Sequence, residues 1–107
     1  MDNTSAIVVL ITASSTEEAE NIAKSLVEDK LVACVNIIPQ ITSIYWWEGK
    51  ICKDEEVMLI SKTKQSLFTA VMDRVKFLHS YEVPEIISFP ISKGSPEYLN
   101  WIEKVAK

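Results

Sequence analysis

Hydrophobic and polar positions follow distinct periodic patterns in the first third of the chain. Residues 6–13 form an apolar run, which is typical of a central strand buried on both faces. Over residues 19–27, apolar side chains recur at intervals of three and four, which predicts an amphipathic helix. Ser15 and Glu18 stand three residues apart before this pattern and predict a capping box at the start of the helix.

The last third of the chain also alternates between helical and strand patterns. A helical stripe over residues 67–78 predicts a second helix, for which Thr63 or Ser66 can provide the N-terminal cap. Residues 86–91 form a short apolar strand, and Pro96 after a serine marks the start of a final helix. The pattern of this last third therefore predicts a helix, a strand and a second helix, in that order.

Residues 31–63 between these parts read as two long strands that reverse direction at Gly49. The first arm, Ala33 to Trp47, has 15 residues and spans roughly 50 Å when fully extended. A compact domain of this length has a diameter of only roughly 34 Å. The hairpin is therefore expected to project beyond the core or to bend at Pro39, which fits only an edge or a bulge.

The tip of this hairpin is apolar on both faces. One small chain can hardly cover both, so a second subunit is the expected source of cover. The residues concerned are Ile44, Tyr45, Trp46, Trp47 and Ile51.

The predicted order is βαββαβ followed by a terminal helix. Two crossover helices on one side of an antiparallel sheet give the split βαβ, or ferredoxin-like, arrangement. We therefore predict an α+β fold with a long hairpin between the second and third strands, in a single domain over residues 1–107.

Composition narrows the possible partners and the cellular location. The net charge of −4 argues against nucleic acid or an anionic membrane as the main partner. The start of the chain has neither the pattern of a signal peptide nor that of a membrane span. Cys34 and Cys52 show no paired spacing and are expected to be reduced thiols in a cytoplasmic protein.

Six short motifs lie at defined spacings between Val8 and Trp101. They read Ala33-Cys34-Val35-Asn36, Trp46-Trp47-Glu48-Gly49-Lys50, Glu56-Val57, Lys62-Thr63, His79-x-Tyr81-Glu82-Val83-Pro84-Glu85 and Tyr98-Leu99-x-Trp101. Together they closely resemble the CutA divalent-cation-tolerance family. The resemblance implies a ferredoxin-like subunit, a tight homotrimer built on the long hairpins, cytosolic residence and a link to copper tolerance, which is a phenotype rather than a known reaction.

The resemblance also defines an expectation for metal binding. A copper-binding member of the family uses a cysteine and two adjacent histidines at the positions that correspond here to Ile11, Leu78 and His79. Only His79 keeps a donor atom, and the family's His-Pro-Tyr reads His79-Ser80-Tyr81 in this chain. If copper or another divalent cation binds, we expect weak binding through His79, with Cys34 as a second candidate. A lone histidine at a helix end is otherwise commonly a cap.

A further set of residues at the motif positions predicts a ligand site. In a trimer these residues would line three equivalent clefts between subunits, where ligand sites tend to form. Acids, a cation, an imidazole and a phenol would suit a small anionic or zwitterionic ligand, or a metal complex. The set consists of Glu56, Lys62, His79, Tyr81 and Glu85, with Trp47 from a neighbouring subunit.

Two other functions remain open. His79, Tyr81 and Glu85 could transfer protons in a small trimeric enzyme, and the trimer could equally be a scaffold for another protein. The sequence has no nucleophile–base pairing, cofactor loop or complete metal set. We therefore expect a binding or regulatory trimer rather than an enzyme.

Overall fold

A computed structural model describes residues 5–107 of the chain. The first four residues of the predicted domain therefore lie outside the described part. The elements follow the predicted order, with one added 3-10 turn. They are β1 (Ala6–Ala13), α1 (Thr16–Glu28), β2 (Cys34–Trp47), β3 (Lys50–Lys64), η1 (Gln65–Leu67), α2 (Phe68–Leu78), β4 (Ile86–Pro90) and α3 (Pro96–Val105).

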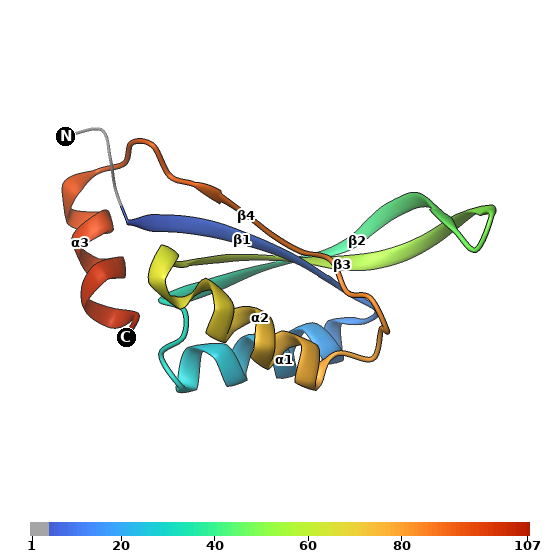
Figure 1. Cartoon of the computed structure of the whole chain (residues 1–107), viewed down its shortest axis with the longest axis horizontal. Coiled ribbons are helices and arrows are strands. Elements are labelled where there is room, and N and C mark those ends of the chain that lie inside the picture. The colour runs from blue at the N-terminus through green and yellow to red at the C-terminus, as the bar shows by residue number, and fades with distance from the viewer. Residues whose placement is uncertain (1–4) are drawn as a thin grey trace.

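The strands form one antiparallel sheet in the order β2-β3-β1-β4. Helices α1 and α2 pack on the same face of this sheet, and α3 lies at the end opposite the hairpin tip (Figure 1). This confirms the α+β fold, and the strand order is that of the split βαβ arrangement.

The core lies between the sheet and its two crossover helices. It contains Val9, Ile11, Ile22, Leu26, Val32, Leu59, Val71 and Val75, all of them fully buried. The expectation that β1 is buried on both faces holds for one face only, because Val8 and Leu10 are only partly buried. Helices α1 and α2 both lie on the other side of the sheet, so these two crossover helices do not cover the two side chains.

The outer half of the long hairpin has no third strand beside most of its length. Strand β1 pairs with residues 57–64 of β3, whereas β2 pairs with β3 from Lys62 out to Lys50. The outer half therefore projects from the body of the molecule (Figure 1). With the hairpin included, the chain measures 45 × 27 × 22 Å along its principal axes.

Two local features of the hairpin match their predicted positions. The strand register shifts between Ile38 and Ile41, which is a bulge around Pro39, and Gln40 has a φ of 61°. The reversal falls at Glu48 and Gly49, with φ values of 50° and 77°. Positive φ at both central residues is typical of the type I′ turn, whose twist suits a two-residue hairpin.

The predicted cap of the second helix is wrong. Strand β3 continues to Lys64, and Thr63 is buried in it with its hydroxyl donating to the Leu31 carbonyl over 2.6 Å. The chain then makes the 3-10 turn, and α2 begins without a side-chain cap.

The capping box of α1 is correct in one half only. Ser15 Oγ accepts from the Glu18 N–H over 3.1 Å, as predicted. The Glu18 carboxylate does not return to Ser15 but accepts from the N–H and hydroxyl of Ser14 and from the Ser80 N–H. It therefore ties the start of α1 to the loop that follows α2.

Candidate functional site

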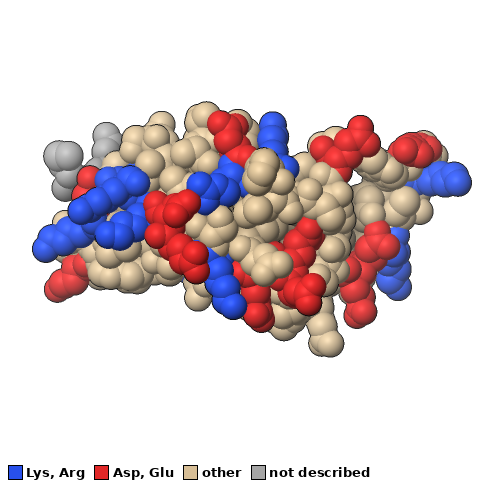
Figure 2. Space-filling model, turned by 90° about the horizontal axis from the view of Figure 1, so that it is seen from below, with Lys and Arg blue, Asp and Glu red and all other residues tan. Residues whose placement is uncertain are grey.

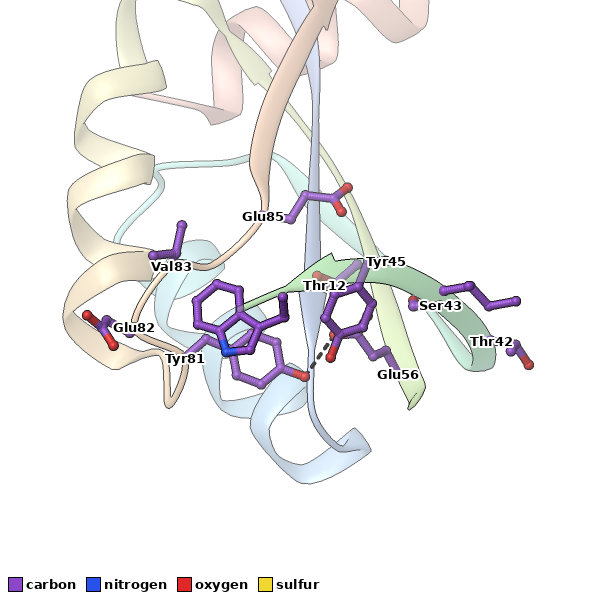
Figure 3. Close-up of a pocket in the computed structure, with 11 residues that line it drawn as sticks. Thr12, Thr42, Ser43, Tyr45, Glu56, Tyr81, Glu82, Val83 and Glu85 are labelled. Carbon is purple, nitrogen blue, oxygen red and sulfur yellow. Dashed lines mark hydrogen bonds between the residues drawn. The ribbon is translucent and has the colours of Figure 1, made fainter. Parts of the chain in front are cut away.

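A cavity of about 680 Å³ opens at the base of the hairpin (Figure 3). Three parts of the chain meet there: the end of β1, the two arms of the hairpin, and the loop between α2 and β4. The lining residues are Thr12, Thr42, Ser43, Ile44, Tyr45, Trp47, Glu56, Tyr81, Glu82, Val83 and Glu85.

Glu56 is the buried acidic residue of this cavity. It faces Ile41 across the hairpin and directly precedes the part of β3 that pairs with β1. The residue is only 9% exposed, and its carboxylate accepts a hydrogen bond from the Tyr81 hydroxyl over 2.8 Å (Figure 3). No lysine, arginine or histidine of residues 5–107 forms an ion pair with it. A buried carboxylate without a cation is uncommon, since buried charges are usually paired.

Tyr81 is held in the state in which it donates this hydrogen bond. Burial of the ring, followed by the hydrogen bond to Glu56 and the negative charge of that residue, raises the pKa of the Tyr81 phenol well above its usual 10. The phenol therefore stays protonated near neutral pH, where it can orient one oxygen of Glu56 but is a poor base.

His79 holds the loop that carries Tyr81. Its side chain is fully buried; Nε2 donates to the Thr12 carbonyl over 2.6 Å, and Nδ1 accepts from the Tyr81 N–H over 3.0 Å. A carbonyl can only accept and a backbone N–H can only donate, so these bonds assign the neutral tautomer with its proton on Nε2.

The geometry gives no support to the prediction of a metal site at His79. Both ring nitrogens are already in hydrogen bonds, and neither Ile11 nor Leu78 offers a donor atom. Within the described part of the chain, no three His, Cys, Asp or Glu side chains gather closely enough to hold a metal ion. Cys34, the second candidate, lies at the other end of the sheet, where its Sγ is 3.5 Å from the Tyr98 hydroxyl.

Glu18 fixes the same loop from the other side. Partial burial alone would raise the pKa of its carboxyl group, but hydrogen bonds from Ser14 and Ser80 outweigh this and lower the pKa to about 2. His79 and Glu18 together attach the cavity loop to β1 and α1.

The predicted ligand set is only partly brought together. Glu56, Tyr81 and Glu85 line one cavity, but Lys62 and His79 do not. The Trp47 that lines this cavity belongs to the same chain, not to a neighbouring subunit as predicted. Lys62 pairs with Val8 and Cys34 on the neighbouring strands, and its ammonium group donates to the Asn36 side chain. The charged side chains of the cavity are therefore all acidic. This favours a cationic ligand over an anionic one, which was among the ligands expected from the sequence.

Several lining residues were not predicted from the sequence. Glu82 directly follows Tyr81 in its motif, and Tyr45 is two positions from Trp47, so alternation along the strand could have indicated it. The Tyr45 hydroxyl donates to Asp54, and this bond, aided by burial and nearby negative charge, raises the phenol pKa to about 12. Thr12 has no sequence signal that marks it.

Comparison with known proteins adds the family to this geometry. Residues 7–105 match the family model described as CutA1 divalent ion tolerance protein. The chain belongs to the CutA1 family. A CutA1 structure from Thermus thermophilus superposes with a TM-score of 0.94 at 49% identity, covering 95% of this chain and 99% of that one.

Relatives of this CutA1 chain come from several kinds of organism. The divalent-cation tolerance protein CutA of Archaeoglobus fulgidus is 50% identical over 99 residues, covering 92% of this chain and 96% of the relative. The chloroplastic CutA 1 of rice is 47% identical over 97 residues; the match covers 91% of this chain and only 55% of that protein. A structure of the archaeal protein is titled periplasmic, so the relatives' names differ in compartment. No helix of residues 5–107 is long and apolar enough to span a membrane.

Proposed function

We propose that this CutA1 chain is a homotrimeric binding protein in the cytoplasmic response to divalent metal ions such as copper. Its ligand site is the cavity at the base of the hairpin, completed by a neighbouring subunit. The protein binds a ligand and has a regulatory role, and it does not catalyse a reaction. The observation that carries this proposal is the buried carboxylate of Glu56, which has no ion-pair partner among residues 5–107 and lies in a cavity beside an uncovered aromatic hairpin tip.

The hairpin tip supports the assembly. Ile44, Trp46 and Ile51 are 68%, 71% and 66% exposed in the single chain. Side chains of this size in one contiguous region are typical of a subunit interface. Beyond Glu56 the hairpin also lacks a third strand, so its backbone edges are free to pair with another chain.

A second apolar surface also needs cover. On the sheet face opposite the helices, Val8 pairs with Phe89 and Leu10 pairs with Ile87, so the four side chains lie together. Phe89 and Ile87 are about half exposed. Packing of this face against other subunits would remove it from water in the same assembly.

The chemistry of the cavity supports binding rather than catalysis. The raised pKa of Tyr81 takes the phenol further from the neutral range in which acid–base catalysis is efficient. His79 is committed to two structural hydrogen bonds. The proton-transfer trio considered from the sequence therefore contains two members that are poorly suited to that task.

The link to copper is proposed at the level of a response. Divalent cations prefer several oxygen, nitrogen or sulfur donors that converge on one point. Within residues 5–107 the acids of the cavity do not gather closely enough to hold a metal ion, so direct copper binding to one chain is expected to be weak.

Sedimentation velocity at micromolar concentration, followed by a thermal-shift screen with cations and small metabolites, tests this function. A trimer that is stabilised by a ligand agrees with the proposal. A trimer that no ligand stabilises favours the scaffold function, and a stable folded monomer contradicts the assembly and the shared site.

A further inference from the structure

The cavity at the base of the hairpin combines three carboxylates with three aromatic side chains. Glu56 is buried, whereas Glu82 and Glu85 are exposed. Tyr45, Trp47 and Tyr81 line the same space. Figure 3 shows the Tyr81 hydroxyl pointing at the Glu56 carboxylate, to which it donates a hydrogen bond. Such a site has negative charge at its base and on its rim, and aromatic side chains along its walls.

These features distinguish between two kinds of cation. Mg²⁺ and Ca²⁺ need about six or more oxygen ligands at about 2.0–2.6 Å. In residues 5–107 the acids of this cavity do not form such a group. An organic ammonium ion needs no such shell, since one carboxylate balances its charge and aromatic faces attract it through their quadrupoles.

The size of the cavity favours the same choice. Its volume of about 680 Å³ lies within the range of about 300–1,000 Å³ that is typical of sites for small organic molecules. A single inorganic ion would fill only a small part of it, while an ammonium group on an aliphatic stem or carrying methyl groups can contact several walls.

The charge distribution of the whole molecule would guide a cation towards this half. On the face that carries α1 and α2, acidic side chains are spread over the hairpin half, together with basic ones at the tip. A group of basic side chains lies at the opposite end (Figure 2). Exposed carboxylates near a site raise the local concentration of cations and their rate of association.

We infer that the cavity binds an organic ammonium cation, with Glu56 as its charge partner and the rings of Trp47 and Tyr81 as its walls. This inference rests on the proposed function, since it names the ligand class of the same site. Tyr81 donates to one oxygen of Glu56 and leaves the other for the ligand. His79 holds the backbone of Tyr81 and is a positioning residue.

Titration of the full chain with tetramethylammonium chloride tests the inference, with sodium chloride at the same ionic strength as the reference. Tryptophan indole N–H resonances report binding near Trp47. Tetramethylammonium has no hydrogen-bond donor and no lone pair, so its binding reports only attraction to negative charge and contact with aromatic rings. We expect saturable binding that sodium does not reproduce.

Two matched variants locate the site. Glu56→Gln keeps an acceptor for the Tyr81 hydroxyl but removes the charge, and we expect it to weaken tetramethylammonium binding at least about tenfold. Glu55→Gln changes an exposed neighbour on the opposite face of the strand and should leave the affinity within about twofold. Sedimentation of both variants checks that assembly is intact.

The possible results separate this inference from the proposed function. If tetramethylammonium acts no differently from sodium, or binds Glu56→Gln as well as the unmodified chain, the inference is overturned. Copper binding that is lost in Glu56→Gln, without any response to tetramethylammonium, would overturn the organic cation but keep a ligand site in the cavity. An intact trimer that binds neither would overturn both.

Discussion

Replacement of Glu18 by glutamine tests how the loop of the cavity is attached to the body of the fold. One carboxylate oxygen accepts from the N–H and the hydroxyl of Ser14, and the other accepts from the Ser80 N–H over 2.8 Å. Glutamine keeps one acceptor and places an NH₂ group where the second oxygen was. We expect it to lose the bond to Ser80 and the charge that strengthens the other bonds.

The size and the pH dependence of the effect follow from the pKa of Glu18. It falls from its ordinary value of 4.5 to about 2 in the folded chain, which corresponds to at most about 3 kcal/mol at about 1.36 kcal/mol per pKa unit. The side chain is 15% exposed, and we expect screening to leave about 2 kcal/mol. Because the folded pKa is the lower one, this contribution is present above pH 4.5 and is lost as the pH falls through 2.

Urea unfolding of both proteins at equal concentration, followed by tryptophan fluorescence, gives the difference directly. Glu18→Gln should be less stable by about 2 kcal/mol at pH 7 and by less than about 1 kcal/mol at about pH 2.5. Glu17→Gln is the control, because Glu17 is also in the first turn of α1 but makes no side-chain hydrogen bond in the described part of the chain. A deficit that is equal at both pH values, or an equal loss in Glu17→Gln, would refute the reasoning.

Three further predictions concern assembly and the cavity. Trp47→Asp should dissociate the trimer at micromolar concentration, because an unpaired carboxylate in a desolvated contact costs several kcal/mol; sedimentation that still shows a trimer contradicts this. The reversible melting temperature should rise with protein concentration, since subunit folding is linked to assembly; a concentration-independent transition to unfolded chain counts against it. His79→Ala should cost about 2–3 kcal/mol in urea unfolding through two lost hydrogen bonds and a buried void, whereas Ser80→Ala, with its exposed side chain, should change stability by less than about 0.5 kcal/mol.

Much of the fold could be predicted from local patterns. The apolar run of β1, the projecting hairpin and the bulge at Pro39 each depend on residues close together in the sequence. The predicted cap of α2 was wrong because Thr63 can act either as a cap or as a buried strand residue. Which of these it becomes depends on the pairing of β3 with β1, which is not visible locally.

The candidate site was harder to predict because it depends on distant contacts. Trp47, Glu56, Tyr81 and Glu85 were found through their motifs, but the same reasoning included Lys62. Lys62 is six residues from Glu56 along one strand, which places it roughly 20 Å away. The hydrogen bond from His79 to Thr12 joins residues 67 positions apart, so the sequence could suggest a metal ligand but not its structural role.

The most direct test of the central claim is a crystal structure of the protein soaked with tetramethylarsonium, an analogue of tetramethylammonium whose arsenic atom is located by anomalous scattering. We predict a trimer with an arsenic peak in each cavity, between the Glu56 carboxylate and the rings of Trp47 and Tyr81, and with a neighbouring subunit closing the site. Cavities without a peak, or cavities that face solvent with no neighbouring subunit, would contradict the account.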